Sequence, residues 1–143
     1  AADSLSVGAV NAVTDADHKV TFVAPPSGKV EIEISISILT TSARYLILFL
    51  ADTALGSPIN FPNTDDVTNQ HMVGTIQVEA EPKLLIHKWV VEGLTAGTEY
   101  TWYLGARAEQ AGRVRLSWGG DAVDEYPPFI MKATALPATI YTG

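Results

Sequence analysis

Apolar and polar residues alternate along most of the chain, with the period of two that is typical of β-strands. The clearest case is the stretch from Val30 to Ile38, in which Val or Ile stands at every second position and Glu or Ser stands between. One face of such a strand is buried and the other is solvated, and β-branched side chains suit its pleat. The pattern therefore predicts a half-buried antiparallel strand here.

Further segments with strand-like patterns follow at short intervals, separated by turn-forming residues. The segment from Arg44 to Ala51 is apolar on both faces, which predicts a central strand. No stretch longer than about 10 residues looks helical. The chain is therefore expected to be one all-β domain over residues 1–143, an antiparallel β-sandwich of jelly-roll type with about eight to nine strands. An N-terminal arm is expected over residues 1–10, and the remaining strands at 6–13, 19–24, 72–80, 83–92, 99–108, 113–119 and 129–136.

The composition of the chain excludes several function classes. The chain has 143 residues, no cysteine and a formal net charge of −7. A chain without cysteine has no disulfide scaffold, cysteine nucleophile or zinc-thiolate site. An acidic surface repels phosphate groups, so neither nucleic acid nor an anionic membrane surface is an expected partner. The longest apolar run, Tyr45 to Ala51, is too short to span a bilayer.

Candidate catalytic and metal-binding residues form no recognisable motif. The three histidines, His18, His71 and His87, stand far apart in the sequence. Their spacing places no nucleophile beside a base, so neither an enzyme nor a cofactor is predicted. Carboxylates in predicted loops could bind calcium, but they do not match the calcium-loop motif, which favours solvated loop charges. These carboxylates are Asp15 with Asp17, Asp65 with Asp66, and Asp121 with Asp124 and Glu125.

Several strands carry charged and aromatic residues in the phase opposite to their apolar residues. Trp102 and Trp118 share the apolar phase and are expected in the core, whereas Tyr103 stands in the other phase. Arginine and tyrosine are favoured at protein interfaces. We therefore expect an oligomer contact in which arginines meet the acids of a neighbouring subunit. The candidate interface residues are Tyr103, Arg107, Arg113, Arg115, Glu31, Glu33 and His87, the last of which alternates with Leu85 and Trp89.

The segment Gly93–Trp102 resembles the turn before the sixth strand of a fibronectin type III domain. In that family a leucine, a small turn and a tyrosine form the tyrosine corner, and Leu94 and Tyr100 occupy those positions here. The resemblance covers about ten residues. The tryptophan that the family carries on an early strand has no counterpart, because no tryptophan precedes Trp89.

Three blocks in order resemble structural proteins of tailed bacteriophages: Val20–Ser37, Gly93–Ala108 and Tyr126–Leu136. The first block is a strand that enters a Pro-Ser-Gly turn and leaves as a long alternating strand. The resemblance implies a β-sandwich, often trimeric, on tail fibres, on minor tail proteins or on the outside of heads. It brings no catalytic residue.

The function that this resemblance implies is a non-enzymatic bacteriophage virion structural protein on the outer surface of the particle. No shaft, collagen-like repeat or coiled coil accompanies the sandwich, which favours a capsid decoration or head accessory protein that stabilises the shell. Such a homotrimer would bind the major capsid protein or tail proteins, through residues 1–10 or the long Asp52–Gln70 loop. A ligand that binds the assembled state alone stabilises it by mass action.

The alternative is a tail-fibre or minor tail adhesion module that binds host-surface carbohydrate. In that case the binding residues are expected at the tips of the loops and on the polar strand face. Tyr103 is the candidate on the strand face, and the candidate ligand-facing loop residues are Phe61, Asp65, Asp66 and Tyr126.

Overall fold

The computed structural model describes residues 3–40, 45–54, 71–73, 83–120 and 125–137, and these residues form ten β-strands and no helix. The prediction of an all-β fold is confirmed. No helix among these residues is long and apolar enough to cross a membrane. The strands are β1 (Asp3–Ser6), β2 (Ala12–Val13), β3 (Lys19–Val23), β4 (Val30–Thr40), β5 (Leu46–Ala51), β6 (His71–Val73), β7 (Lys83–Val91), β8 (Glu99–Ala108), β9 (Val114–Trp118) and β10 (Ile130–Ala135).

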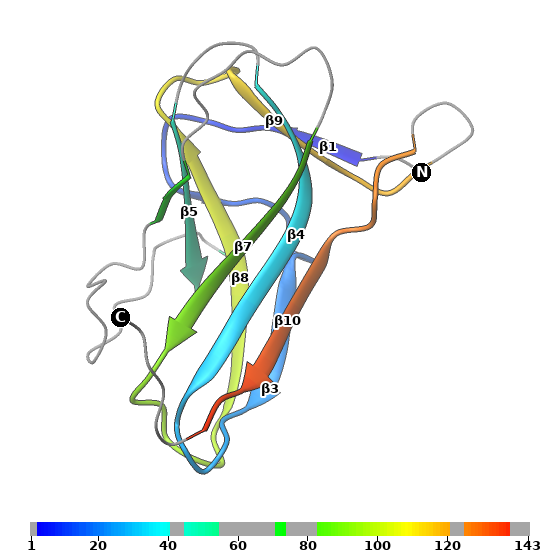
Figure 1. Ribbon diagram of the computed structural model, residues 1–143. Helices are drawn as coiled ribbons and strands as arrows, with labels where there is room; N and C mark the ends of the chain where they lie inside the picture. Colours follow the sequence, from blue (N-terminus) through cyan, green and yellow to red (C-terminus); the bar gives the residue numbers. More distant parts are fainter. Residues whose placement is uncertain (1–2, 41–44, 55–70, 74–82, 121–124, 138–143) are drawn as a thin grey trace.

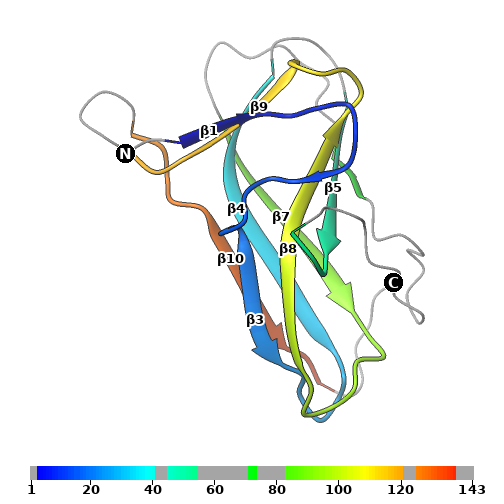
Figure 2. The same cartoon turned by 180° about the vertical axis from the view of Figure 1, so that it is seen from behind.

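The strands form two antiparallel sheets that face each other (Figures 1 and 2). Sheet A has β4 at its centre, with β7 on one side and with β10 and β9 on the other, and β1 pairs with β9. Sheet B has β8 paired with β5 on one side and with β2 and β3 on the other, and β6 pairs with β5. Strand β5 therefore lies inside its sheet, as its apolar sequence predicts.

The core lies between the two sheets and contains the alternating apolar residues of both. In β4 the side chains of Ile32, Ile34 and Ile36 are fully buried, which confirms the predicted alternation in this strand. Each such side chain contributes about 1.5–3 kcal/mol by leaving water. Trp102 of β8 is in the core cluster as expected, and Trp118 of β9 is partly buried against it.

Two turns that are far apart in the sequence lie against each other at one end of the sandwich. The Gly28 carbonyl accepts a hydrogen bond from the Leu94 amide at 3.0 Å, and the Gly97 amide donates to the Ala24 carbonyl at 2.9 Å. Gly28 has a φ of 67°, and a Cβ at this position would lie 2.6 Å from the Leu94 carbonyl oxygen. Glycine is therefore required here for its backbone conformation and for space. The Tyr100 hydroxyl accepts a hydrogen bond from the Thr95 amide at 3.1 Å, the contact of a tyrosine corner.

The N-terminal segment differs from its expected form. Residues 3–6, expected within an arm, form β1 and pair with β9, and Val7 behind them is buried. The weak strand expected at 6–13 is two short strands, because the chain passes from sheet A at β1 to sheet B at β2. Gly8 lies in the connection between them. The strand expected at 72–80 is observed as β6, and residues 74–80 lie outside the described residues.

Candidate interaction surface

The outer side of sheet A presents a mixed apolar and charged surface built from the strands β7, β4 and β10. On each strand, these residues are the outward members of the alternating pattern. The central strand β4 contributes the acids, and the flanking strands β7 and β10 contribute lysines and apolar residues. We call this set the sheet A surface. It consists of Leu84, Ile86, Lys88, Val90, Glu31, Glu33, Ser35, Ile130 and Lys132.

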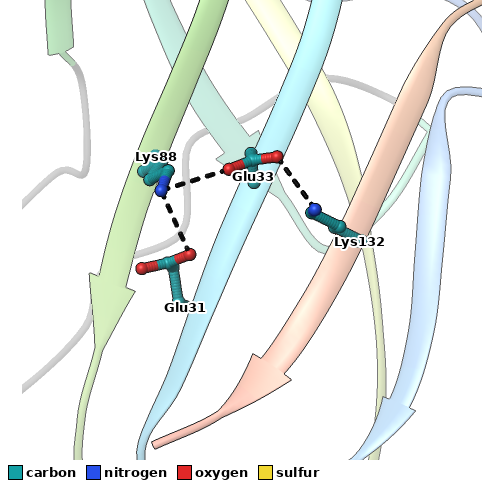
Figure 3. Close-up of polar contacts among 4 residues, drawn as sticks. All are labelled: Glu31, Glu33, Lys88 and Lys132. Carbon is teal, nitrogen blue, oxygen red and sulfur yellow. Dashed lines mark ion pairs between the residues drawn. The ribbon is translucent and has the colours of Figure 1, made fainter.

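An ion-pair ladder crosses the middle of the sheet A surface (Figure 3). Strand register places Glu33 opposite both Lys88 and Lys132. The carboxylate oxygens of Glu33 lie 3.2 Å from the Lys88 Nζ and 3.1 Å from the Lys132 Nζ. Lys88 also lies 3.6 Å from Glu31. Both oxygens of Glu33 are thus engaged by neighbouring strands of the same chain.

The contacts of the ladder shift the pKa values of Glu33 and Lys88. Hydrogen bonds from Lys132 first, and then from Lys88, lower the pKa of Glu33 below its usual range. The hydrogen bond with Glu33 raises the pKa of Lys88. Both shifts favour the charged forms of Glu33 and Lys88, so the ion pair between them persists at neutral pH.

Exposed apolar side chains surround the ladder. Ile86 and Ile130 stand on either side of Ser35 in the next row of the sheet, and they are 56% and 48% exposed. Leu84 and Val90 on β7 are 51% and 40% exposed. Within the described part of the chain, β7 pairs with β4 alone, so it is an edge strand of sheet A. An apolar edge strand of this length is a template for pairing with another chain.

The predicted interface residues separate into different regions of the molecule. Glu31 and Glu33 lie on the sheet A surface, but lysines of their own chain already neutralise them. Arg115 lies opposite Leu39, six positions along β4 from Glu33, which corresponds to about 20 Å of strand. The Arg115 Nη1 approaches the Ser4 Oγ at 3.5 Å. Arg113 is half-buried just before β9.

Tyr103 and Arg107 belong to sheet B and not to the sheet A surface. Lys19 lies over the Tyr103 ring, with its Nζ 5.9 Å from the ring centroid. Arg107 stands opposite Ile47 of β5. The candidate interface arginines, Tyr103 and the acids of β4 therefore do not form one surface within a single chain. Whether these residues meet across a subunit boundary stays a prediction.

Sequence reasoning missed Lys88 and Lys132, which hold the ladder together. Their alternation places both lysines on the outer face, and this signal is present in the sequence. The missing information was register, because the face of a strand does not tell which residue of the next strand stands opposite. The His87 ring contacts His71 inside the chain, and the place of His87 at a subunit interface stays a prediction.

The remaining predicted residues are those of the candidate ligand-facing loop. Phe61, Asp65 and Asp66 fall outside the described residues. Tyr126 is half-buried, and its amide donates to the Gly119 carbonyl at 2.9 Å. Nearby is an open pocket of about 300 Å³, which Tyr126 does not line. The pocket is lined by Asp15, Asp17, His18, Trp118, Gly119, Pro128 and Phe129.

The chemistry of this pocket is set by a buried histidine. Thr14 Oγ1 is hydrogen-bonded to the Nδ1 of His18 at 2.8 Å and lies 3.3 Å from the Leu104 carbonyl oxygen. The His18 ring stacks on Phe129 with 3.9 Å between centroids. The described residues contain no group of three His, Cys, Asp or Glu side chains placed to hold a metal ion.

Comparison with known proteins adds no identification at this point. No protein-family profile, curated protein sequence or solved structure matches the chain.

Proposed function

We propose that this protein is a non-enzymatic structural subunit that binds other protein subunits through the sheet A surface. The observation that carries the proposal is the exposure of apolar side chains around the charged ladder. Three of them, Leu84, Ile86 and Val90, lie on the edge strand β7, and Ile130 lies on β10. Burying such side chains against a partner yields roughly 25 cal/mol for each Å² removed from water. Single exposed apolar residues are ordinary, whereas a cluster of them marks an interaction site.

The ladder would contribute specificity to such a contact. Charged groups at an interface fix its orientation and exclude wrong partners more than they add affinity. The pattern Lys88–Glu33–Lys132 presents positive charge on both sides of a negative centre. A partner with an acidic group beside each lysine matches this pattern, and a partner with basic groups there is repelled.

The particular assembly that we propose is a bacteriophage particle. The protein would be a homotrimeric capsid decoration or head accessory protein on the outer surface, of jelly-roll type, bound to the major capsid protein. The support is the resemblance of the three sequence blocks, two of which contribute the packed turns around Gly28 and Leu94. Binding across shell joints would stabilise the assembled shell by mass action.

Self-association is the most direct test, and the chain offers a matched pair of variants. Ile86 and Val23 are β-branched strand residues that are 56% and 59% exposed, but Val23 lies on β3 of sheet B. We expect light scattering to show a trimer for the wild type and for Val23→Glu, and a monomer for Ile86→Glu. A wild-type protein that is strictly monomeric at high micromolar concentration contradicts self-association. Trimers in both variants contradict the role of the sheet A surface.

Location on a particle requires a second test. Immunogold labelling of intact phage particles should place label over the head surface. Label confined to the tail tip would refute the head accessory assignment, and absence of label from particles would refute the virion assignment while leaving the self-association result intact.

The second candidate function is a tail adhesion module that binds carbohydrate. The observation that favours it is the open pocket that combines Trp118 and Phe129 with the carboxylates of Asp15 and Asp17. Aromatic faces and carboxylate acceptors are groups that suit a sugar ring with its hydroxyls. A glycan array would detect such binding, and Asp17→Asn should weaken it, whereas Tyr126→Ala tests the loop residue outside the pocket.

A further inference from the structure

Two histidines meet at an edge of the sandwich, one from each sheet. His71 comes from β6 of sheet B and His87 from β7 of sheet A. The Nδ1 of His71 and the Nε2 of His87 are 2.8 Å apart. Both rings are half-buried, and the ring of Trp89, itself 2% exposed, lies 5.6 Å from His71 and 4.8 Å from His87 between centroids.

The two rings form a hydrogen bond that requires one proton between them. One of the facing nitrogens carries a hydrogen and the other offers its lone pair. A neutral imidazole ring keeps one nitrogen lone pair, and neutral imidazole is the form that binds metal ions.

We propose that His71 and His87 form a binding site for one divalent first-row transition ion of the Zn²⁺, Ni²⁺ and Cu²⁺ class. The metal ion takes the place of the shared proton, and that proton moves to the other nitrogen of its own ring. Both facing lone pairs then point at the ion, and no net proton is released. Imidazole nitrogen suits this class of ion, and Cu²⁺ should bind more tightly than Ni²⁺ or Zn²⁺.

The geometry needs an adjustment of both rings. Two imidazole nitrogens at about 2.0–2.1 Å from a tetrahedral ion are about 3.3 Å apart. The observed separation of 2.8 Å must therefore widen by about 0.5 Å, and each ring must turn toward the ion, because a tetrahedral ion lies off the line that joins the two nitrogens. The chain supplies two ligands in this proposal, and water completes the coordination.

Metal binding at this place would connect the two sheets. Strand β6 is paired within sheet B and strand β7 within sheet A. An ion bound to His71 of β6 and His87 of β7 would therefore bridge the two sheets. A ligand that binds the folded state alone raises its stability by mass action. This consequence does not depend on the proposed function, since it needs no partner subunit.

Isothermal titration with ZnCl₂ tests the site on the whole protein. We expect one Zn²⁺ ion per chain for the wild type, and an affinity at least about tenfold lower for His87→Gln and for His71→Gln. Loss of a group that only hydrogen-bonds to a metal ligand already costs about tenfold or more in affinity, and loss of the ligand itself should cost at least as much. Met72→Gln is the matched control, since Met72 lies on β6 beside His71 and is 65% exposed. Unchanged affinity in both histidine variants would overturn the proposal.

The ring protons of the three histidines give a readout in the wild-type protein that needs no variant. In a nuclear magnetic resonance titration with Zn²⁺, the ring signals of His71 and His87 should move together. Those of His18, whose Nδ1 is hydrogen-bonded to Thr14 in a buried site, should not move. Zn²⁺ at about 100 times its dissociation constant should also raise the melting temperature by about 5–10 °C. Signals of both histidines that do not respond to Zn²⁺ would refute the site.

Discussion

Strands β5 and β7 share one feature of sequence and have different environments, although β7 also carries His87 and Lys88 in its middle. Both carry apolar residues on both faces, a pattern that indicates burial on both sides. In β5 all six residues are buried. In β7 the inward Trp89 and Val91 are buried, whereas the outward Leu84 and Ile86 are about half exposed. The difference shows that an apolar pattern predicts burial but does not identify the surface that covers the apolar side chains.

The two strands also differ in their place within the sheets. Strand β5 lies between β8 and β6, and its outward Phe49 is fully buried. The Phe49 ring occupies the space above Gly105 of β8, where a Cβ would come within 2.1 Å of it. Strand β7 is an edge strand whose outer residues are open in the single chain. The apolar outer residues of β7 are thus what a partner subunit would cover.

The largest expected effect comes from emptying the covered face of β5. Phe49→Ala removes a fully buried ring and should lower the free energy of unfolding by about 3–5 kcal/mol. Urea denaturation followed by tryptophan fluorescence measures the change. A loss below about 1 kcal/mol would show that the outer face of β5 is not packed as described.

A smaller effect is expected from overfilling the same place. Gly105→Ala puts a methyl group where the Phe49 ring lies, which should lower the free energy of unfolding by about 1–3 kcal/mol. Gly8→Ala is the control, because no atom lies within 4 Å of a Cβ there, and it should change stability by less than about 0.5 kcal/mol. Equal effects of the two substitutions in thermal denaturation would contradict the close contact at Gly105.

The all-β class and the faces of several strands were predictable, and the candidate surface was predictable in part. Alternation assigned the faces of β4, the continuous apolar run assigned the central place of β5, and the strand at 99–108 has its predicted bounds. These features depend on local periodicity, which the sequence contains. The ladder depends on which residues stand opposite Glu33, and that register is fixed by packing between segments far apart in the chain. The meeting of His71 and His87 likewise depends on how two sheets lie against each other.

Truncation of an exposed side chain on the outer face of β7 should leave the stability of the isolated chain almost unchanged. Ile86→Ala removes a side chain that is 56% exposed, so the free energy of unfolding should change by less than about 0.5 kcal/mol at low protein concentration. The same substitution should weaken self-association, measured by sedimentation equilibrium, because it removes apolar area from the proposed contact. A loss of stability as large as that of Phe49→Ala would remove the distinction between the two strands.

The smallest expected effect concerns the charge ladder beside these residues, and it is a dependence on pH. The hydrogen bonds from Lys132 and Lys88 lower the pKa of Glu33 below its ordinary value of 4.5, so the folded state releases this proton more readily than the unfolded state. The ladder's contribution to stability is therefore present above pH 4.5 and is lost as the pH falls through the lowered pKa of Glu33. Lys132→Gln removes the largest cause, and the Glu33 pKa should then move back toward 4.5. Carboxyl chemical shifts followed through an acid titration measure both values. An unchanged Glu33 pKa in Lys132→Gln would contradict the assignment of Lys132 as its main partner.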